Sequence, residues 1–213
     1  MIDYLYTGHL KDPEVAFSFA VTTSLANVAV LKHNCGPVSG HILGRALTAG
    51  LLSASMLGDK ERINIRWQYN GHLKTLIVDA GSEGDVRGFI SPKDLMAYEG
   101  EPHDVFGEAG RITVVRTHEG QVRNDGVAET GLHNAIQDLA FFFSTSDQLE
   151  TGMCVMIGLA RDVDQPVRLC QGLMIQALPG CDPERFNVLR TNMDKEQVHD
   201  LMTQPTEADS HFE

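Results

Sequence analysis

Cys35 is the residue of this sequence best suited to nucleophilic chemistry, because His33 and His41 lie close to it along the chain. A cysteine attacks as its thiolate, and a nearby histidine or helix N-terminus can favour that charged form. The sequence offers no third residue that would orient the histidine. A small enzyme that uses Cys35 with a histidine is one alternative, and a loop cysteine without a catalytic role is the simpler interpretation.

The residues that could bind metal or phosphate do not form a recognised pattern. Nine histidines and four cysteines are present, but no C-x-x-C pair and no H-x-x-x-H spacing occurs. A structural zinc site is usually built from such local ligand pairs. Glycines at 36, 40 and 44 precede or open a helix, yet the Lys and Ser/Thr of a phosphate-binding loop are missing. We therefore expect no metal or other cofactor in this chain.

Composition restricts the class of protein. A chain of 213 residues with 42% hydrophobic residues is long and apolar enough for one large domain, or one domain plus an appendage. The formal net charge of −12 disfavours non-specific binding to nucleic acids and anionic membranes. Neither a membrane-length apolar run nor an N-terminal signal pattern is visible. We expect a cytoplasmic protein that binds neither nucleic acid nor membrane.

The first part of the chain predicts strands followed by a helix. Weakly alternating apolar residues predict one or two strands over residues 14–32, interrupted at Thr22-Thr23-Ser24. A loop follows, and then a helix that begins at Val38 or Ser39 and runs to Leu57. Its apolar and small residues recur at helical spacing around the axis, which indicates packing on more than one side.

An antiparallel meander is predicted over residues 61–90. Its first strand has four apolar residues on one face, and polar residues alternate with them: Ile63, Ile65, Trp67 and Tyr69. Asn70-Gly71 is a typical hairpin turn and leads into a second strand, and a third follows at residues 86–90. Such an apolar face is usually buried core, and an exposed binding surface is the alternative.

The second half of the chain predicts helices and strands in alternation. In order they are a short helix at Asp94–Tyr98, a strand at Ile112–Arg116, a helix at Gly131–Leu149, and a hairpin of strands Met153–Ala160 and Pro166–Leu178. The predicted fold class is α+β, with mostly antiparallel sheets crossed by two helices and a C-terminal linker helix.

A break in the pattern follows the last predicted strand. Pro179 has no N–H to continue a β-ladder, and Gly180 can adopt the positive φ of a sharp turn. Asp182 can then cap a helix that has Pro183 at its first position. We therefore expect a core domain over residues 1–180, a hinge at Pro179-Gly180, and a linker region over residues 181–213.

The predicted linker region has proportionally fewer apolar and more charged residues than the core. A helix over Asp182–Met202 has a thin apolar stripe that includes Phe186, Leu189, Met193 and Leu201 among charged residues. The segment Thr203–Glu213 is polar and predicted to be disordered.

Three stretches of the sequence resemble the redox-regulated holdase chaperones, the thirty-three-kilodalton bacterial heat-shock family. Gln171–Gly180 reads QGLMIQALPG and matches most of that family's strand G-G-F-L-I-Q-L-L-P-G. Asp138–Thr151 follows the family's helix D-L-A-x-Y-[FL]-x-x-S-[ED]-Q-x-x-[ST] closely. Leu43–Leu57 matches a third helix, L-[LG]-x-[AL]-L-x-A-x-L-L-x-x-x-L. The resemblance covers roughly Asp3 to Leu189 in the correct order.

The resemblance implies an ATP-independent chaperone that binds unfolding proteins under oxidative stress through exposed apolar surface. In that family a C-terminal domain holds zinc on a C-x-C and a C-x-x-C cysteine pair. Oxidation releases the zinc, unfolds that domain and its helical linker, and uncovers apolar surface on the core. None of the four cysteines of this sequence forms either pair. Zinc is therefore expected to be absent, and redox sensing is not predicted for this chain.

The partners implied by the resemblance are unfolded or partly folded client proteins. The client-binding residues predicted here are the strand face 63, 65, 67 and 69 and the helix stripe Phe186, Leu189 and Met193. A homodimer could form by swapping of the C-terminal helix if the hinge at Pro179-Gly180 opens. A homodimeric adaptor that binds no clients is a further alternative.

Overall fold

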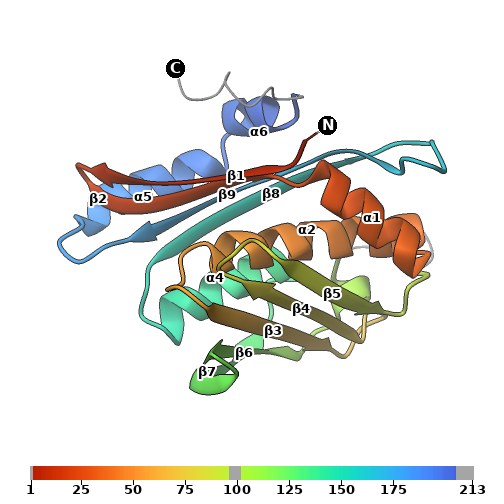
Figure 1. Ribbon diagram of the computed structural model, residues 1–213, viewed down its shortest axis with the longest axis horizontal. Coiled ribbons are helices and arrows are strands. Elements are labelled where there is room, and N and C mark those ends of the chain that lie inside the picture. Colours follow the sequence, from red (N-terminus) through yellow and green to blue (C-terminus); the bar gives the residue numbers. More distant parts are fainter. Residues whose placement is uncertain (1, 96–101, 205–213) are drawn as a thin grey trace.

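The computed structural model describes residues 2–95 and 102–204, and these form two antiparallel sheets with helices between and outside them (Figure 1). The four-stranded sheet A has the order β1-β2-β9-β8, and the five-stranded sheet B has the order β5-β4-β3-β6-β7. Helices α2 and α4 lie between the sheets, while α6 lies on the far side of sheet A. The predicted α+β class is confirmed.

Sheet A is built from the first two and the last two strands of the chain. Its strands are β1 (Tyr4–Lys11), β2 (Glu14–Val21), β8 (Thr151–Leu159) and β9 (Val167–Ala177). β2 pairs with β9, so residues more than 150 positions apart, such as Val15 and Ala177, are direct neighbours. The predicted hairpin of the last two strands is confirmed as β8 and β9.

Sheet B contains the predicted meander. Its strands are β3 (Glu61–Tyr69), β4 (Thr75–Gly81), β5 (Val86–Ser91), β6 (Gly110–His118) and β7 (Gln121–Thr130). β7 was not predicted, because it is an edge strand whose residues are mostly exposed. An edge strand needs backbone pairing on one side only, and so it can form with few apolar residues.

Residues 23–33 correct one prediction, because they form helix α1 (Thr23–His33) where a strand was expected. The buried side chains are Thr23, Ala26 and Val30, which recur at helical spacing, whereas Val28 and Leu31 are exposed. The neighbouring strand β2 ends at Val21, so the polar stretch predicted as a break marks the change from strand to helix.

Helix α2 (Pro37–Ala54) is the central element, since it contacts both sheets. Two glycines permit this close packing. A Cβ on Gly44 would lie 2.7 Å from Ile157 of sheet A, and a Cβ on Gly50 would clash with Val78 of sheet B. Small residues therefore allow one helix to lie within contact distance of two β-layers.

The remaining helices are α3 (Pro102–Phe106), α4 (Ala135–Thr145), α5 (Pro183–Met193) and α6 (Glu196–Met202). α4 is shorter than predicted because Asn134 caps it, accepting a hydrogen bond from the Ile136 amide at 3.1 Å. The predicted helix Asp182–Met202 is two helices separated by Asp194-Lys195. Residues 96–98 of the predicted helix Asp94–Tyr98, and the tail beyond residue 204, lie outside the described residues.

The buried apolar residues form two clusters, one on each side of sheet A. The main core lies between the sheets and contains Trp67, Leu43 and Phe142. The second cluster lies between sheet A and the C-terminal helices α5 and α6. Sheet A is therefore covered by apolar contacts on both faces.

Candidate functional site

The strand face predicted to bind clients lies inside the main core. Ile63, Ile65 and Trp67 are 0% exposed and Tyr69 is 7% exposed. The Trp67 indole N–H donates a 3.0 Å hydrogen bond to the carbonyl of Ala135 in α4. In the folded chain this face is therefore buried core and not an exposed surface. A role in client binding stays a prediction and requires the core to open.

A buried carboxylate holds this face against α4. Asp138 accepts a 2.7 Å hydrogen bond from the Tyr69 hydroxyl and two 3.2 Å hydrogen bonds from the amides of Gly131 and Leu132. Burial, and then the charge of Asp138, raise the pKa of Tyr69 far above its usual value, so the phenol remains a donor. The arrangement is a structural link between sheet B and α4.

The second cluster is formed by the predicted helix stripe and the outer face of sheet A. Within α5 and α6, the buried side chains are Phe186, Met193 and Met202. They pack against sheet residues that alternate along β2, β8 and β9, namely Val15, Phe19, Val21, Cys154 and Ile175. Leu189 is partly buried there, whereas Leu201 is 53% exposed. The stripe is confirmed as a packing surface, except that Met202 takes the place expected for Leu201.

Helix α5 begins as the sequence predicts and approaches sheet A closely at one point. The Asp182 carboxylate accepts hydrogen bonds from the amides of Glu184 and Arg185, at 2.9 and 3.2 Å. Gly180 has φ of 93°, the left-handed conformation that glycine tolerates. At Gly152 of β8 a Cβ would lie only 3.1 Å from the Met193 sulfur. A side chain at Gly152 would therefore push α5 outward.

Ion pairs at the ends of α5 add little to this attachment. Arg185 pairs with Asp12, and Arg190 lies 3.5 Å from Glu150. All four side chains are more than 40% exposed, so solvent screens both pairs. The helices are held on sheet A chiefly by their three buried side chains in the second cluster.

Two cavities lie beside α5, so the helix does not seal the sheet completely. One, of about 480 Å³, is lined by Leu149, Leu178, Pro179 and Phe186 among others. The other, of about 230 Å³, lies between α4 and α5 and includes Phe141 and Met193. Phe141 is half exposed at this groove. Apolar surface is therefore accessible beside the covering helix, in two cavities that both adjoin Arg190.

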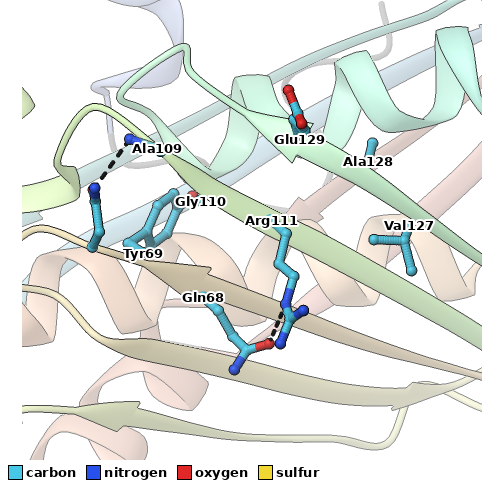
Figure 2. A pocket seen from close by; sticks show the side chains of 9 residues that line it. Gln68, Tyr69, Ala109, Gly110, Arg111, Val127, Ala128 and Glu129 are labelled. Atoms are coloured by element: carbon cyan, nitrogen blue, oxygen red, sulfur yellow. Dashed lines mark hydrogen bonds between the residues drawn. The ribbon is translucent and has the colours of Figure 1, made fainter.

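A third cavity, of about 550 Å³, lies at the ends of strands β3, β6 and β7 (Figure 2). The Arg111 guanidinium donates a 2.8 Å hydrogen bond to the Gln68 side chain there, and Glu129 lies on the neighbouring strand. Among the residues that line it there is no histidine, cysteine or serine. The cavity therefore supplies no histidine base and no serine or cysteine nucleophile.

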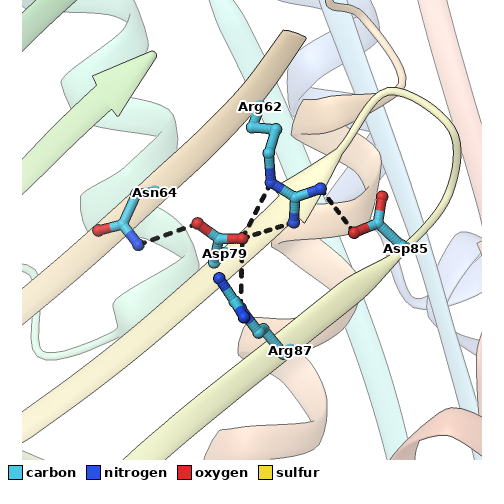
Figure 3. A network of polar contacts seen from close by, with 5 residues as sticks. All are labelled: Arg62, Asn64, Asp79, Asp85 and Arg87. Carbon is cyan, nitrogen blue, oxygen red and sulfur yellow. Dashed lines mark hydrogen bonds and ion pairs between the residues drawn. The ribbon is translucent and has the colours of Figure 1, made fainter. Parts of the chain in front are cut away.

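A network of charged side chains connects β3, β4 and β5 on the outer face of sheet B (Figure 3). Arg62 donates to Asp79 at 2.5 and 3.1 Å and to Asp85 at 2.6 Å. Partial burial opposes ionisation of Asp79, but hydrogen bonds from Arg62 and Asn64 outweigh it and lower the pKa of Asp79. Every charge has a partner, which indicates a stabilising role for the network.

The enzyme alternative finds no support at Cys35. Burial raises the pKa of the Cys35 thiol, although Lys93 opposes this. Burial and then Arg45 lower the pKa of His41 to about 4. In the described part of the chain no hydrogen bond joins Cys35 to either histidine, and no group of three or more potential ligands could hold a metal ion. None of its helices is long and apolar enough to cross a membrane.

Comparison with known proteins identifies the family. The family profile described as Hsp33 protein matches residues 3–211. The chain belongs to the Hsp33 family. Within that family, the 33 kDa chaperonin of Clostridium tetani is 33% identical over 190 residues, which cover 85% of this chain and 63% of the relative. The 33 kDa chaperonin of Citrifermentans bemidjiense is 29% identical over 201 residues, which cover 92% and 67%.

The chain therefore spans about two thirds of the length of these curated relatives. A solved Hsp33 homologue from Thermotoga maritima shares the fold, with a TM-score of 0.79 over 96% of this chain and 71% of that chain. The sequence identity between the two is 22%, so this match supports the fold alone.

The sheet side of the second cluster was not predicted. Val15, Phe17, Phe19 and Val21 alternate with Ala16, Ser18 and Ala20, and both sets are largely buried. A strand without any polar face is typical of a sheet covered on both sides. That signal was present in the sequence, but it did not reveal which element covers the second face.

Proposed function

We propose that this chain is an ATP-independent holdase chaperone that binds unfolding proteins through the outer face of sheet A. Membership of the Hsp33 family supports the general function. The second apolar cluster under α5 and α6 is the observation that supports the surface. Clients would occupy the place that the two helices occupy in the folded chain.

The two helices cover apolar side chains on the outer face of sheet A. When they leave, the side chains of Tyr4, Tyr6, Phe17, Phe19 and Ile175 become part of one continuous exposed patch. Large exposed apolar patches are uncommon on monomeric proteins and are typical of surfaces that bind other proteins. Burial of a non-native chain against this patch would restore the lost hydrophobic contacts without ATP.

The hinge predicted at Pro179-Gly180 would allow this movement. Release of α5 and α6 would change the conformation only of residues that follow Ala177, where β9 ends. Sheet A would therefore keep its strand pairing. The same hinge would allow α5 and α6 to exchange between two copies, which stays a prediction that light scattering can test. The family's redox activation is assigned to cysteine pairs that this sequence does not contain, so it is not part of the proposal. A cytoplasmic location likewise remains a prediction.

The test compares two substitutions in the same helix of the full chain. Phe186→Asp places a charge in the second cluster and should release α5, whereas Val188→Asp adds the same charge at a site that is 59% exposed. Light scattering of a thermally unfolding client is measured at a stoichiometric ratio. We expect Phe186→Asp to suppress aggregation more strongly than the unmodified chain. Val188→Asp should suppress aggregation only as much as the unmodified chain does.

Two outcomes would contradict the proposal. If neither the unmodified chain nor Phe186→Asp suppresses aggregation, the chain is not a holdase by itself. If both suppress aggregation equally, clients bind a surface other than the one beneath α5 and α6. A third variant, Phe186→Asp with Phe17→Ser, should lose part of the gained activity, because Phe17 belongs to the uncovered patch.

A further inference from the structure

The interface that holds the C-terminal helices on sheet A is rich in sulfur. Met193 is the last residue of α5, and Met202 is the last residue of α6. The Met202 sulfur lies 3.9 Å from the Cys154 thiol of β8. Met156 and Cys181 are packed at the margin of the same cluster. Sulfur side chains therefore gather where the helices meet the sheet.

The two methionines carry much of the attachment. They are 6% and 5% exposed, and Phe186 is the remaining buried side chain of the two helices. For α6, Met202 is the single buried side chain. A change that makes either thioether polar therefore weakens the contact that holds its helix on the sheet.

Thioether and thiol sulfurs differ in how readily they react with peroxide here. Burial raises the pKa of Cys154 to about 11, and Asp194 adds to this while Arg45 opposes it. At neutral pH the group is a thiol, and the thiolate that reacts with oxidants is scarce. A methionine sulfur needs no deprotonation before it is oxidised. Of the two sulfurs in contact at this interface, Met202 is therefore more reactive toward peroxide than Cys154.

We propose that Met193 and Met202 are oxidation sites, and that their conversion to sulfoxides by a peroxide releases α5 and α6 from sheet A. The sulfur lone pair attacks one oxygen of hydrogen peroxide, so that an S–O bond forms as the O–O bond breaks. Sulfur loses two electrons, and the departing hydroxide takes the proton from the oxygen now bound to sulfur and leaves as water. The resulting polar S=O group cannot be buried against Val15, Phe19 and Ile175 without a cost in free energy.

Local opening gives the oxidant access to these buried sulfurs. α5 and α6 have few buried side chains, so they can open while the main core stays folded. Met174 provides an internal control, because it is 1% exposed and belongs to the main core. If opening controls access, oxidation at Met193 and Met202 should precede oxidation at Met174.

The claim that opening of α5 and α6 uncovers a client-binding face rests on the proposed function. The oxidation of Met193 and Met202 and the release of the two helices do not depend on it. The full chain is treated with hydrogen peroxide, and sulfoxide at each methionine is followed by peptide mass spectrometry. Amide hydrogen exchange over residues 183–202 reports release of the helices. We expect Met193 and Met202 to oxidise at least tenfold faster than Met174, and amide protection of α5 and α6 to fall as they do.

Two variants sharpen the test. Asp182→Ala removes the cap of α5 and should speed oxidation at Met193 about fivefold, the factor expected for loss of an N-cap. Met193→Leu with Met202→Leu keeps the apolar volume but cannot form sulfoxides, and it should retain its amide protection in peroxide. Methionine sulfoxide reductases should restore protection to the oxidised original chain.

Two results would overturn the inference. One is oxidation of Met193 and Met202 only at the rate of Met174, which would mean that the helices do not open separately. The other is full oxidation of both residues with protection of residues 183–202 unchanged. The second result leaves the proposed function standing, because it does not involve a client, whereas the first also counts against a client-binding face beneath α5 and α6. Absence of client binding leaves the oxidation sites standing.

Discussion

Phe186→Ala should open the C-terminal helices without unfolding the main core. Phe186 is 2% exposed in the second cluster. Removal of a buried phenylalanine ring typically costs 3–5 kcal/mol, and a site covered by one helix should fall near the lower value, about 3 kcal/mol. Since each 1.4 kcal/mol is a factor of ten, amide protection in α5 should fall by up to about 100-fold.

The chain contains a probe for the core alone. Trp67 is its single tryptophan, and it is fully buried in the main core and not part of the second cluster. Urea unfolding followed by Trp67 fluorescence should therefore keep its midpoint in Phe186→Ala. Val188→Ala is the matched control, and because Val188 is exposed, it should change neither measurement by more than about 0.5 kcal/mol.

One result would refute this reasoning. If the tryptophan midpoint of Phe186→Ala falls in step with the amide protection of α5, the two clusters unfold as one cooperative unit. Sheet A would then couple the helices to the main core, and uncovering its outer face would require global unfolding. That outcome would also remove the basis for local opening in the oxidation of Met193.

Three further predictions concern Gly152, His41 and Asp138. Gly152→Val should displace α5 and lower its amide protection, because a side chain there meets Met193, whereas Gly131→Val should not, since no atom lies within 4 Å of a Cβ at Gly131. The pKa of His41 is about 4 in the folded chain and 6.5 ordinarily, so the unfolded chain binds the proton first and stability is lost as pH falls below 6.5. Between pH 7 and pH 5 urea unfolding should show a loss of about 2 kcal/mol that His41→Gln does not show, and equal losses in both would contradict the assignment. Asp138→Leu should cost about 3 kcal/mol of unfolding free energy, because the Tyr69 hydroxyl and two backbone amides lose their acceptor. Asp138→Asn should cost less, since it keeps an acceptor oxygen, and equal unfolding temperatures for the two variants would argue against these hydrogen bonds as the cause.

Local chemistry made several elements predictable. Period-two alternation from Ile63 to Tyr69 and the Asn70-Gly71 turn predicted β3 and its partner, because a strand with one buried face must alternate. The end of β9 and the start of α5 were equally readable, since Pro179, Gly180 and Asp182 act through their own backbone and side-chain geometry. In such segments the residue type itself dictates the conformation.

Other elements depended on their surroundings. Residues 23–33 have apolar side chains that fit either a weak strand or a helix, and contact of Ala26 and Val30 with the core decides for the helix. β7 forms because β6 offers it a backbone to pair with, and its own residues give little sign of it. A pattern read from one segment cannot include the partner that stabilises it.

The sequence by itself determined the family and the junction between sheet A and the C-terminal helices. Only the tertiary structure decided which apolar residues are accessible to function. It buried the face of Trp67 under α4, and it placed Cys154 of β8 beside Met202 of α6, 48 positions further along the chain. The physical reason is that burial and sulfur contacts arise between segments that are distant in sequence, and chain order does not specify those distances.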